Sequence, residues 1–367
     1  MKTLVIAFLA LFVGFVPAAR AGLVEEAGGL AVSFSEGGRA VALDALIIRP
    51  DDRLRHPLAV LSHGAPRDAA DRETMSPGAM RAQAREFARR GWVVVTFMRR
   101  GYGQSEGEYV ESSGKCASPD YVTSGRRSAD DIRAVIRAMA AKPYVDASRI
   151  LSVGRSAGGL ATVALAADPP PGLVAAISFA GGRGSVRPDE VCVPARLVEA
   201  FATFGKTSRV PMLWVYAEND HFFGPALARQ FHDAFAGAGG KAEFIAAAPF
   251  GNDGHSLFSE KGQPIWTRYV DDFLARQHLT LVDRLLPSRD EASITYPGRL
   301  SAQGKESFRK FLDASDHKAF ALSGDGSYGW RSGQKTIDAA VEDAMANCRK
   351  NAKRTCRTVM IDDETVE

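Results

Sequence analysis

The chain has 367 residues, 46% of them hydrophobic and 24% charged, which is the composition of an ordinary globular protein with a large buried core. Its 46 Lys and Arg residues against 43 Asp and Glu residues leave a formal net charge of only +3. A charge this small gives no reason to expect nucleic acid or an anionic membrane surface as a partner, and we exclude both classes of binding protein.

The first 21 residues have the three parts of a secretory signal. Lys2 gives a positive start, residues 4–16 form an apolar run, and Ala19-Arg20-Ala21 is a small-x-small cleavage site. The alternative is an uncleaved membrane anchor, but a membrane span needs about 20 apolar residues. We therefore predict a signal peptide at 1–21, a periplasmic or secreted protein, and no membrane span after the signal is removed.

The predicted elements of residues 22–280 change in character along the chain. They begin with two alternating segments, 30–34 and 41–48, which we expect to form antiparallel strands around a Gly37-Gly38 turn. Short continuous apolar runs then alternate with helical patterns, as expected of strands buried on both faces of a parallel sheet. Strands are predicted at 58–61, 92–97, 150–153, 173–179, 212–216 and 242–247, and helices at 77–90, 160–166, 225–236 and 264–277. A further helix is predicted to be capped by Ser128, with Asp131 in its first turn.

This alternation, joined by right-handed crossovers, predicts an α/β fold with a doubly wound, mostly parallel sheet. Residues 182–209 interrupt it with an amphipathic stretch at 195–204, which we expect to be a lid-like insertion or a plain surface insertion. Residues 281–300 are a predicted linker. Residues 301–367 then form a small α+β C-terminal unit, with a hairpin at 319–322 and 328–331, a helix at 336–350 and a strand at 356–361.

The four cysteines are expected to form two disulfides in an oxidising compartment, where three pairings are available. We expect Cys348 to pair with Cys356, closing a short loop that contributes roughly 2.6 kcal/mol by loop-closure entropy. Cys116 would then join Cys192 in a distant loop. Metal ligation is the alternative, but the sequence has no Cys-x-x-Cys or His-x-x-x-His spacing, so we predict no metal site.

A Gly-x-Ser-x-Gly pentapeptide at 154–158 lies between the strand at 150–153 and the helix at 160–166. This strand, sharp turn and helix is the setting in which a serine is held as a nucleophile at the top of a sheet. A serine hydroxyl also needs a base, a carboxylate that orients the base, and donors for the oxyanion. The sequence therefore predicts Ser156 as a nucleophile whose partners follow in the order acid, histidine.

Asp220 and His255 are the predicted partners, because they follow the strands at 212–216 and 242–247. Taken separately, Asp220 could simply cap a helix and His255 could be an ordinary loop residue. Glu218 and Asp253 remain alternatives for the acid. The ring of His221, next to Asp220 in sequence, is expected to point away from that carboxylate's partner.

Two backbone groups are predicted to bind the oxyanion. The first is the N–H of Ala157, the residue after the nucleophile. The second comes from the loop at 62–66, where Pro66 has no N–H, so Ala65 is preferred and Gly64 is the alternative. His63 is expected to orient this loop rather than to transfer protons.

The combined motifs resemble the α/β-hydrolase superfamily, and within it the dienelactone hydrolase and prolyl-oligopeptidase-like branch. The resemblance covers residues 40–278 and rests on five short segments, Pro143-Tyr144-Val145-Asp146, Arg149-Ile150, Gly154-x-Ser156-x-Gly158-Gly159, His63-Gly64 and Arg100-Gly101-Tyr102-Gly103-x-Ser105-x-Gly107. It implies the triad named above and no cofactor. The insertion with Cys192 and the loop with Cys116 depart from the family pattern, so the resemblance implies no particular substrate.

These observations predict an exported serine hydrolase that cleaves a small carboxylic ester through an acyl-enzyme on Ser156. The alternative is a prolyl-oligopeptidase-like serine peptidase acting on a short peptide. Such an enzyme needs carboxylates for the free amino end, and Glu106, Glu108 and Glu111 are the candidates. A third reading, less favoured because the triad is complete, is a non-catalytic exported binding protein in which the C-terminal unit does the work.

Overall fold

The computed structural model describes residues 22–34, 40–288 and 294–366. The predicted signal at 1–21 and the Gly37-Gly38 turn lie outside the described residues. Within the described ranges, no helix is both long and apolar enough to cross a bilayer.

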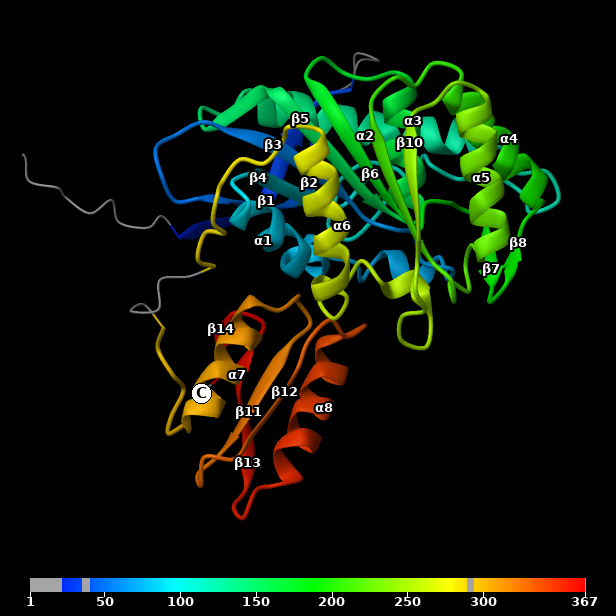
Figure 1. The fold of residues 1–367 in the computed structure, drawn as a ribbon. Helices are drawn as coiled ribbons and strands as arrows, with labels where there is room; N and C mark the ends of the chain where they lie inside the picture. The colour runs from blue at the N-terminus through cyan, green and yellow to red at the C-terminus, as the bar shows by residue number, and fades with distance from the viewer. Residues whose placement is uncertain (1–21, 35–39, 289–293, 367) are drawn as a thin grey trace, which may run out of the picture.

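A central sheet of eight strands runs through the larger part of the described chain, in the order β1-β2-β4-β3-β5-β6-β9-β10 (Figure 1). β2 pairs antiparallel with both β1 and β4, and every other pair of neighbours is parallel. The strands are β1 Leu23–Val32, β2 Val41–Pro50, β3 His56–Ser62, β4 Val93–Phe97, β5 Val145–Arg155, β6 Leu173–Phe179, β9 Met212–Ala217 and β10 Ala242–Ala247. The predicted α/β class with a mostly parallel sheet is confirmed.

Helices cover both faces of this sheet, so the inner strands are buried on both sides, as their continuous apolar runs require. One face packs against α2 Tyr121–Ala140, α3 Ala157–Ala167, α4 Pro194–Gly205 and α5 Pro225–Gly237. The other face packs against α1 Arg81–Arg89 and α6 Gln263–Arg276. Short 3-10 turns occupy Ala70–Arg72, Pro77–Met80 and Gly254–Ser256.

The start predicted for α2 is wrong. The helix begins at Tyr121, because the Asp120 side chain accepts a hydrogen bond from the Thr123 N–H at 2.9 Å and caps the first turn. Ser128 lies inside the helix, where its hydroxyl donates to Glu111. Asp131 is likewise buried in mid-helix and accepts from Arg100.

The insertion at 182–209 contains the strands β7 Ser185–Arg187 and β8 Glu190–Val191 and the helix α4. The apolar face of α4 is buried against α3 and α5 through Leu197, Phe201 and Phe204. A disulfide from Cys192 to Cys116 ties the insertion to the loop before α2. α4 therefore packs beside the sheet, and residues 182–185 are the part of the insertion that reaches Ser156.

The C-terminal unit has a four-stranded antiparallel sheet in the order β12-β11-β13-β14. Its strands are β11 Ala319–Ser323, β12 Tyr328–Arg331, β13 Cys356–Ile361 and β14 Glu364–Thr365. α7 Ala302–Asp313 packs on one face around Phe308 and Phe311, and α8 Ile337–Arg349 packs on the other. Cys348 of α8 is bonded to Cys356 of β13, so both expected disulfides are present.

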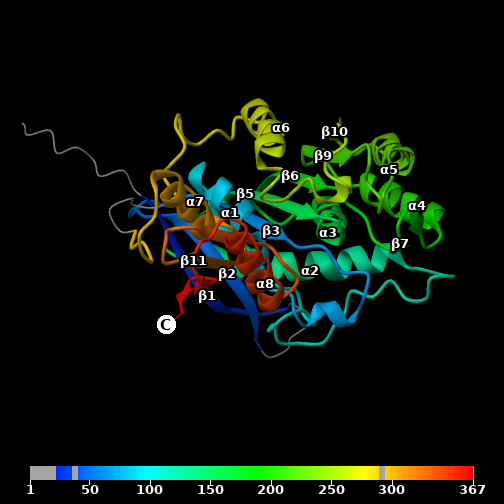
Figure 2. The same ribbon diagram turned by 90° about the horizontal axis from the view of Figure 1, so that it is seen from below.

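The C-terminal unit lies next to the larger part in both views (Figures 1 and 2). Ion pairs connect the two parts. Arg81 of α1 contacts Asp316 at 2.9 Å, and Arg85 contacts Asp313 at 2.7 Å and the Leu312 carbonyl at 2.8 Å. Both arginines also bind Glu25 of β1. α1 is therefore a shared element, buried against the central sheet on one side and bound to the C-terminal unit on the other.

Candidate active site

Ser156 occupies the sharp turn between β5 and α3. Its φ of 56° and ψ of −122° lie outside the regions that residues with a side chain usually adopt. The turn excludes larger neighbours, because a Cβ at Gly154 would lie 2.0 Å from the Gly158 carbonyl oxygen, and one at Gly158 would lie 2.1 Å from that of Ser62. The chain is thus forced to present the serine hydroxyl at the carboxyl end of the sheet.

The structure brings Asp220 and His255 together, although 35 residues separate them. The Nδ1 atom of the His255 ring lies 3.0 and 3.2 Å from the two carboxylate oxygens of Asp220. Both side chains are buried, with relative exposures of 4% and 2%. The Asp220 carboxylate also accepts from the backbone N–H groups of Phe222 and Phe223 at 2.7 and 2.9 Å, which fixes its orientation.

The other candidates for the acid lie elsewhere. Asp253 accepts hydrogen bonds from the backbone N–H groups of His255 and His221, so it shapes the loop and does not contact the imidazole through its carboxylate. Glu218 is exposed. The His221 ring points toward Asp189, with 3.0 Å between its Nδ1 atom and the carboxylate. It therefore points away from the Asp220–His255 pair, as expected.

Burial favours the neutral form of His255 and lowers its pKa, although the hydrogen bond that its ring donates to Asp220 works in the opposite direction. A neutral ring that donates from Nδ1 to Asp220 leaves Nε2 free as a proton acceptor. This is the protonation state that a general base requires near neutral pH.

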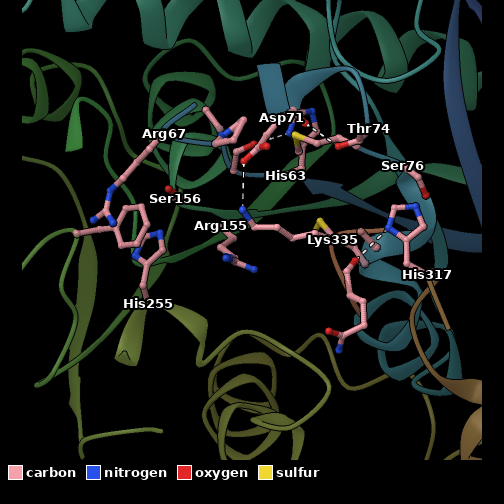
Figure 3. A pocket seen from close by; sticks show the side chains of 18 residues that line it. His63, Arg67, Asp71, Thr74, Ser76, Arg155, Ser156, His255, His317 and Lys335 are labelled. Atoms are coloured by element: carbon pink, nitrogen blue, oxygen red, sulfur yellow. Dashed lines mark hydrogen bonds and ion pairs between the residues drawn. The ribbon is translucent and has the colours of Figure 1, made fainter. Parts of the chain in front are cut away.

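Ser156 and His255 line the same cavity, which has a volume of about 390 Å³ (Figure 3). No hydrogen bond joins the two side chains in the described part of the chain. Catalytic hydrogen bonds of this kind are often long in a substrate-free enzyme and shorten in the complex with substrate. The arrangement can therefore activate a serine if binding of a substrate brings the hydroxyl to Nε2 of His255.

A stack of aromatic rings, which is not predicted from the sequence, covers the imidazole of His255. The Phe222 ring lies parallel to the His255 ring with 3.8 Å between their centroids, and the Arg67 guanidinium lies 3.5 Å from the centre of Phe222. Arg67 is itself held by the Ser185 hydroxyl and the His221 carbonyl, at 2.9 and 3.0 Å. The position of Phe222 two residues after Asp220 was the available signal, but nothing in the sequence places Arg67 against it.

The loop after β3 approaches the serine turn closely, since a Cβ at Gly64 would lie 3.0 Å from that of Ser156. His63 anchors this loop, with Nδ1 at 2.6 Å from the Gly64 carbonyl and Nε2 accepting from the Arg99 N–H at 3.1 Å. Burial, with a smaller contribution from Arg99, lowers the pKa of His63 to about 3, so the ring is neutral and its contacts assign the proton to Nδ1. These contacts suit the orienting role expected of His63.

Ala65 and Ala157, the two predicted oxyanion donors, line a second cavity of about 190 Å³ together with Ser156. Ser156 therefore lines two cavities, one that also contains His255 and one that also contains Ala157, and Ala65 lines both.

Beneath these loops lies a buried ionic cluster. The carboxylate of Glu111 contacts Arg99 at 2.5 Å and Arg183 at 2.6 Å, and accepts from the hydroxyls of Tyr102 and Ser128. Burial alone would raise the pKa of Glu111, but the two arginines hold it well below the ordinary value. The Glu111 carboxylate is therefore ionised, and both of its oxygens accept hydrogen bonds.

The match of a known family profile supports the fold. The profile of the X-Pro dipeptidyl-peptidase family S15 matches residues 37–208, which is less than half of the chain. No curated protein matches the sequence.

Solved structures with a similar arrangement have low sequence identity. An esterase from Pyrococcus furiosus is 15% identical, with 68% of this chain and 90% of that chain covered and a TM-score of 0.47. A putative dienelactone hydrolase from Klebsiella pneumoniae is 18% identical, with 70% and 99% covered and a TM-score of 0.48. Dipeptidyl peptidase 4 from Porphyromonas gingivalis is 20% identical, with 70% and 35% covered and a TM-score of 0.49. Similarity at this level does not assign an activity.

The strand order of the sheet, the serine turn after its fifth strand and the profile match agree with one another. The chain has an α/β-hydrolase fold, and its residues 37–208 are similar to the S15 peptidase family.

Proposed function

We propose that this protein is an exported serine hydrolase that cleaves a carboxylic ester through an acyl-enzyme on Ser156. The observation that carries the proposal is the buried Asp220–His255 pair, which lines one cavity with a serine held in a forced turn. Export rests on the predicted signal and is supported by the two disulfides, which persist in oxidising compartments.

In the acylation half, Nε2 of His255 takes the proton of the Ser156 hydroxyl as the oxygen attacks the ester carbon. The carbonyl oxygen becomes negative and accepts from the N–H groups of Ala157 and Ala65. The bond from carbon to the alcohol oxygen then breaks, and the imidazolium gives its proton to the leaving alcohol. Asp220 stabilises the imidazolium throughout.

In the deacylation half, His255 takes a proton from water as the water oxygen attacks the acyl carbon. The bond to the Ser156 oxygen breaks, the carboxylic acid is released, and the serine regains a proton from the imidazolium. The stacked Phe222 ring keeps the imidazole in one plane through both halves.

A serine peptidase is the second candidate, and the S15 profile match favours it. The site gives less support, because a peptidase of this kind needs carboxylates for a free amino end. Glu106 and Glu108 are exposed, and neither they nor the fully paired Glu111 line the main cavity. Its one acidic lining residue, Asp71, lies near Lys335. We therefore rank an ester above a peptide, and a non-catalytic binding protein third.

The test is labelling of the folded protein with a fluorophosphonate probe, with the Ser156→Ala variant as control. Labelling is expected in the parent and absent in the variant, and an unlabelled parent would refute the hydrolase proposal. Turnover of short acyl esters is then compared with turnover of aminoacyl anilides. Preference for the anilides would reverse the ranking of ester and peptide.

The assignment of the acid is tested by Asp220→Asn and Asp253→Asn. The first change is expected to lower kcat by about 10³–10⁴, because the imidazole loses the partner that sets its tautomer. The second is expected to lower kcat by less than about tenfold, since Asp253 contacts only backbone N–H groups. The reverse order would make Asp253 the acid.

A further inference from the structure

The C-terminal unit contributes to the wall of the cavity that contains Ser156 and His255. His317, Gln334 and Lys335 line it beside residues of the hydrolase part. Figure 3 labels His317 and Lys335 in this wall. The cavity is therefore incomplete without residues that lie more than 60 positions beyond the predicted histidine of the triad.

These three residues belong to an anchored pair of loops. The Gln334 N–H donates to the His317 carbonyl, and Nδ1 of His317 lies 3.0 Å from the Gln334 carbonyl. Ser332, just before them, donates to Glu260 of the hydrolase part at 3.1 Å. The backbone at Lys335 is thus fixed, while its side chain is 87% exposed and reaches Asp71 at 3.6 Å. An exposed pair of this kind contributes little, so the ammonium is available to another anion.

Arg155, the residue before the nucleophile, lines the same cavity. Its Nε atom is buried without a partner, and no hydrogen bond or ion pair to its guanidinium occurs in the described ranges. Burial lowers its pKa, with Asp220 and Asp253 opposing this effect through space. Both of those carboxylates are already bound, to His255 and to backbone N–H groups. A guanidinium that loses water without gaining an acceptor destabilises the folded protein, and an anionic ligand would offset this loss.

The charged lining of the cavity is mainly cationic. Arg67, Arg155 and Lys335 face it, against the single carboxylate of Asp71. Arg67 is held by Phe222 and by the His221 carbonyl, so its position is set by the stack over the imidazole. Arg155 and Lys335 are the two cations whose present contacts leave them able to bind a ligand.

We propose that the C-terminal unit completes the substrate site, and that Lys335 together with Arg155 binds a carboxylate on the substrate, away from the ester bond that is cleaved. This inference rests on the proposed hydrolase function and names its substrate class. The substrate is an ester that carries a second, anionic group.

The test compares esters matched in length and differing in charge. On the acyl side, 4-nitrophenyl hydrogen glutarate is compared with 4-nitrophenyl pentanoate, and on the alcohol side 4-acetoxybenzoate is compared with 4-methylphenyl acetate. The anionic member of at least one pair is expected to have a kcat/KM at least tenfold higher, about the effect of one charge-assisted hydrogen bond. A neutral preference in both pairs overturns the inference.

Variants then assign the effect to residues. Lys335→Gln and Arg155→Gln are expected to raise KM for the anionic ester about tenfold and to change KM for the neutral ester less than twofold. Arg155→Lys should recover part of the loss, and Lys353→Gln, an exposed change on the same unit outside the cavity, should have no effect. Because Lys335 is exposed, its variant tests the inference even where Arg155 variants fold poorly. An equal loss for both esters in Lys335→Gln overturns it.

Binding separates this inference from the hydrolase proposal. The Ser156→Ala variant cannot turn over, and calorimetric titration should show that it binds the preferred anionic ester at least tenfold more tightly than its neutral partner. If the fluorophosphonate probe fails to label Ser156 but this charge preference remains and depends on Lys335, the hydrolase proposal falls and the anion site stands. If labelling occurs without a charge preference, the anion site is refuted and the hydrolase proposal is not.

Discussion

The pKa values of three histidines near the serine turn are shifted differently because their surroundings differ. His63 is buried between a carbonyl and an N–H and stays neutral. His221 is solvent-exposed, and its hydrogen bond with Asp189 raises its pKa. His255 combines burial, which lowers its pKa, with a carboxylate partner that limits the decrease. Of the three, only His255 has both a free ring nitrogen and a face on the main cavity beside Ser156.

For single residues, the sequence predicts features set by neighbouring residues better than contacts between segments that are far apart in the chain. The turn at Ser156 and the positions of Asp220 and His255 after two strands follow from short motifs and strand ends, so the sequence could predict that these residues lie at one edge of the sheet. The stack of Arg67 on Phe222 and the place of Lys335 in the cavity wall could not, because each joins segments whose approach is decided by tertiary packing. Arg155 belongs to the Gly-x-Ser-x-Gly pentapeptide, but only the folded structure shows that its buried Nε has no hydrogen-bond partner.

The pH dependence of ester turnover should report His255. Only the neutral imidazole can accept the serine proton, so activity is lost as pH falls through the pKa of the folded protein. Since burial lowers that pKa, kcat/KM for a neutral ester is expected to rise with a midpoint below about 6.5 and then reach a plateau. Rates measured from pH 4 to 8 check this, with exposed His221→Gln as the control that should leave the midpoint unchanged. A midpoint above 6.5 would contradict the role of burial.

Elements far apart in the sequence meet at Glu111. Its loop lies between the Arg99 segment after β4 and the start of α2, and Arg183 reaches it from the segment after β6. Arg99 also donates to the Ser62 hydroxyl and the His63 carbonyl at 2.8 Å, so the cluster fixes the loop that carries Ala65. We infer that the cluster holds in place the loop that carries Ala65, one of the two proposed oxyanion donors.

The Glu111→Gln change should therefore destabilise the protein strongly. It leaves two buried guanidinium groups without their counter-charge, and a loss of about 3–5 kcal/mol in the free energy of unfolding is expected. Urea denaturation followed by circular dichroism measures it. Glu108→Gln, at an exposed carboxylate nearby, is the control and should change stability by less than about 0.5 kcal/mol. Equal effects of the two changes would show that the cluster contributes no more than a surface charge.

The sequence also predicted elements unevenly, for identifiable reasons. Continuous apolar runs such as those of β3 and β4 mark buried parallel strands clearly, and both were predicted. For α2 the predicted start is too late, because Ser128 and Asp131 together resemble a capped first turn, whereas the real cap is Asp120. The helix α7 is not predicted, although Ser301 caps it and Phe308, Phe311 and Leu312 form its apolar face, because it directly follows the predicted linker.

In the whole molecule, α1 connects the central sheet with the C-terminal unit. Its apolar side, with Ala84 and Phe87, belongs to the core of the central sheet, while Arg81 and Arg85 bind carboxylates of the C-terminal unit. That unit also lines the cavity at Ser156. On the proposed function, we therefore expect the ionic contacts of α1 to affect substrate binding as well as the stability of the interface.

Replacing Arg85 tests this coupling. The side chain is 4% exposed and binds Asp313, Glu25 and the Leu312 carbonyl, so Arg85→Leu removes a buried cation that connects β1 with the C-terminal unit. We expect a loss of about 1.5–3 kcal/mol at the interface, the contribution of hydrogen bonds to a charged group. Calorimetry should then show the C-terminal unit unfolding before the larger part, and KM for the preferred anionic ester should rise while the fluorophosphonate still labels Ser156.

The matched control is Arg331→Leu, because Arg331 pairs with Asp343 inside the C-terminal unit and both side chains are more than 40% exposed. Its loss should be at most about 1 kcal/mol, with a single transition and an unchanged KM. An Arg85→Leu protein that unfolds in one unshifted transition would mean that the apolar contacts of the interface suffice without the arginine. A weakened interface with an unchanged KM would instead separate the C-terminal unit from the substrate site.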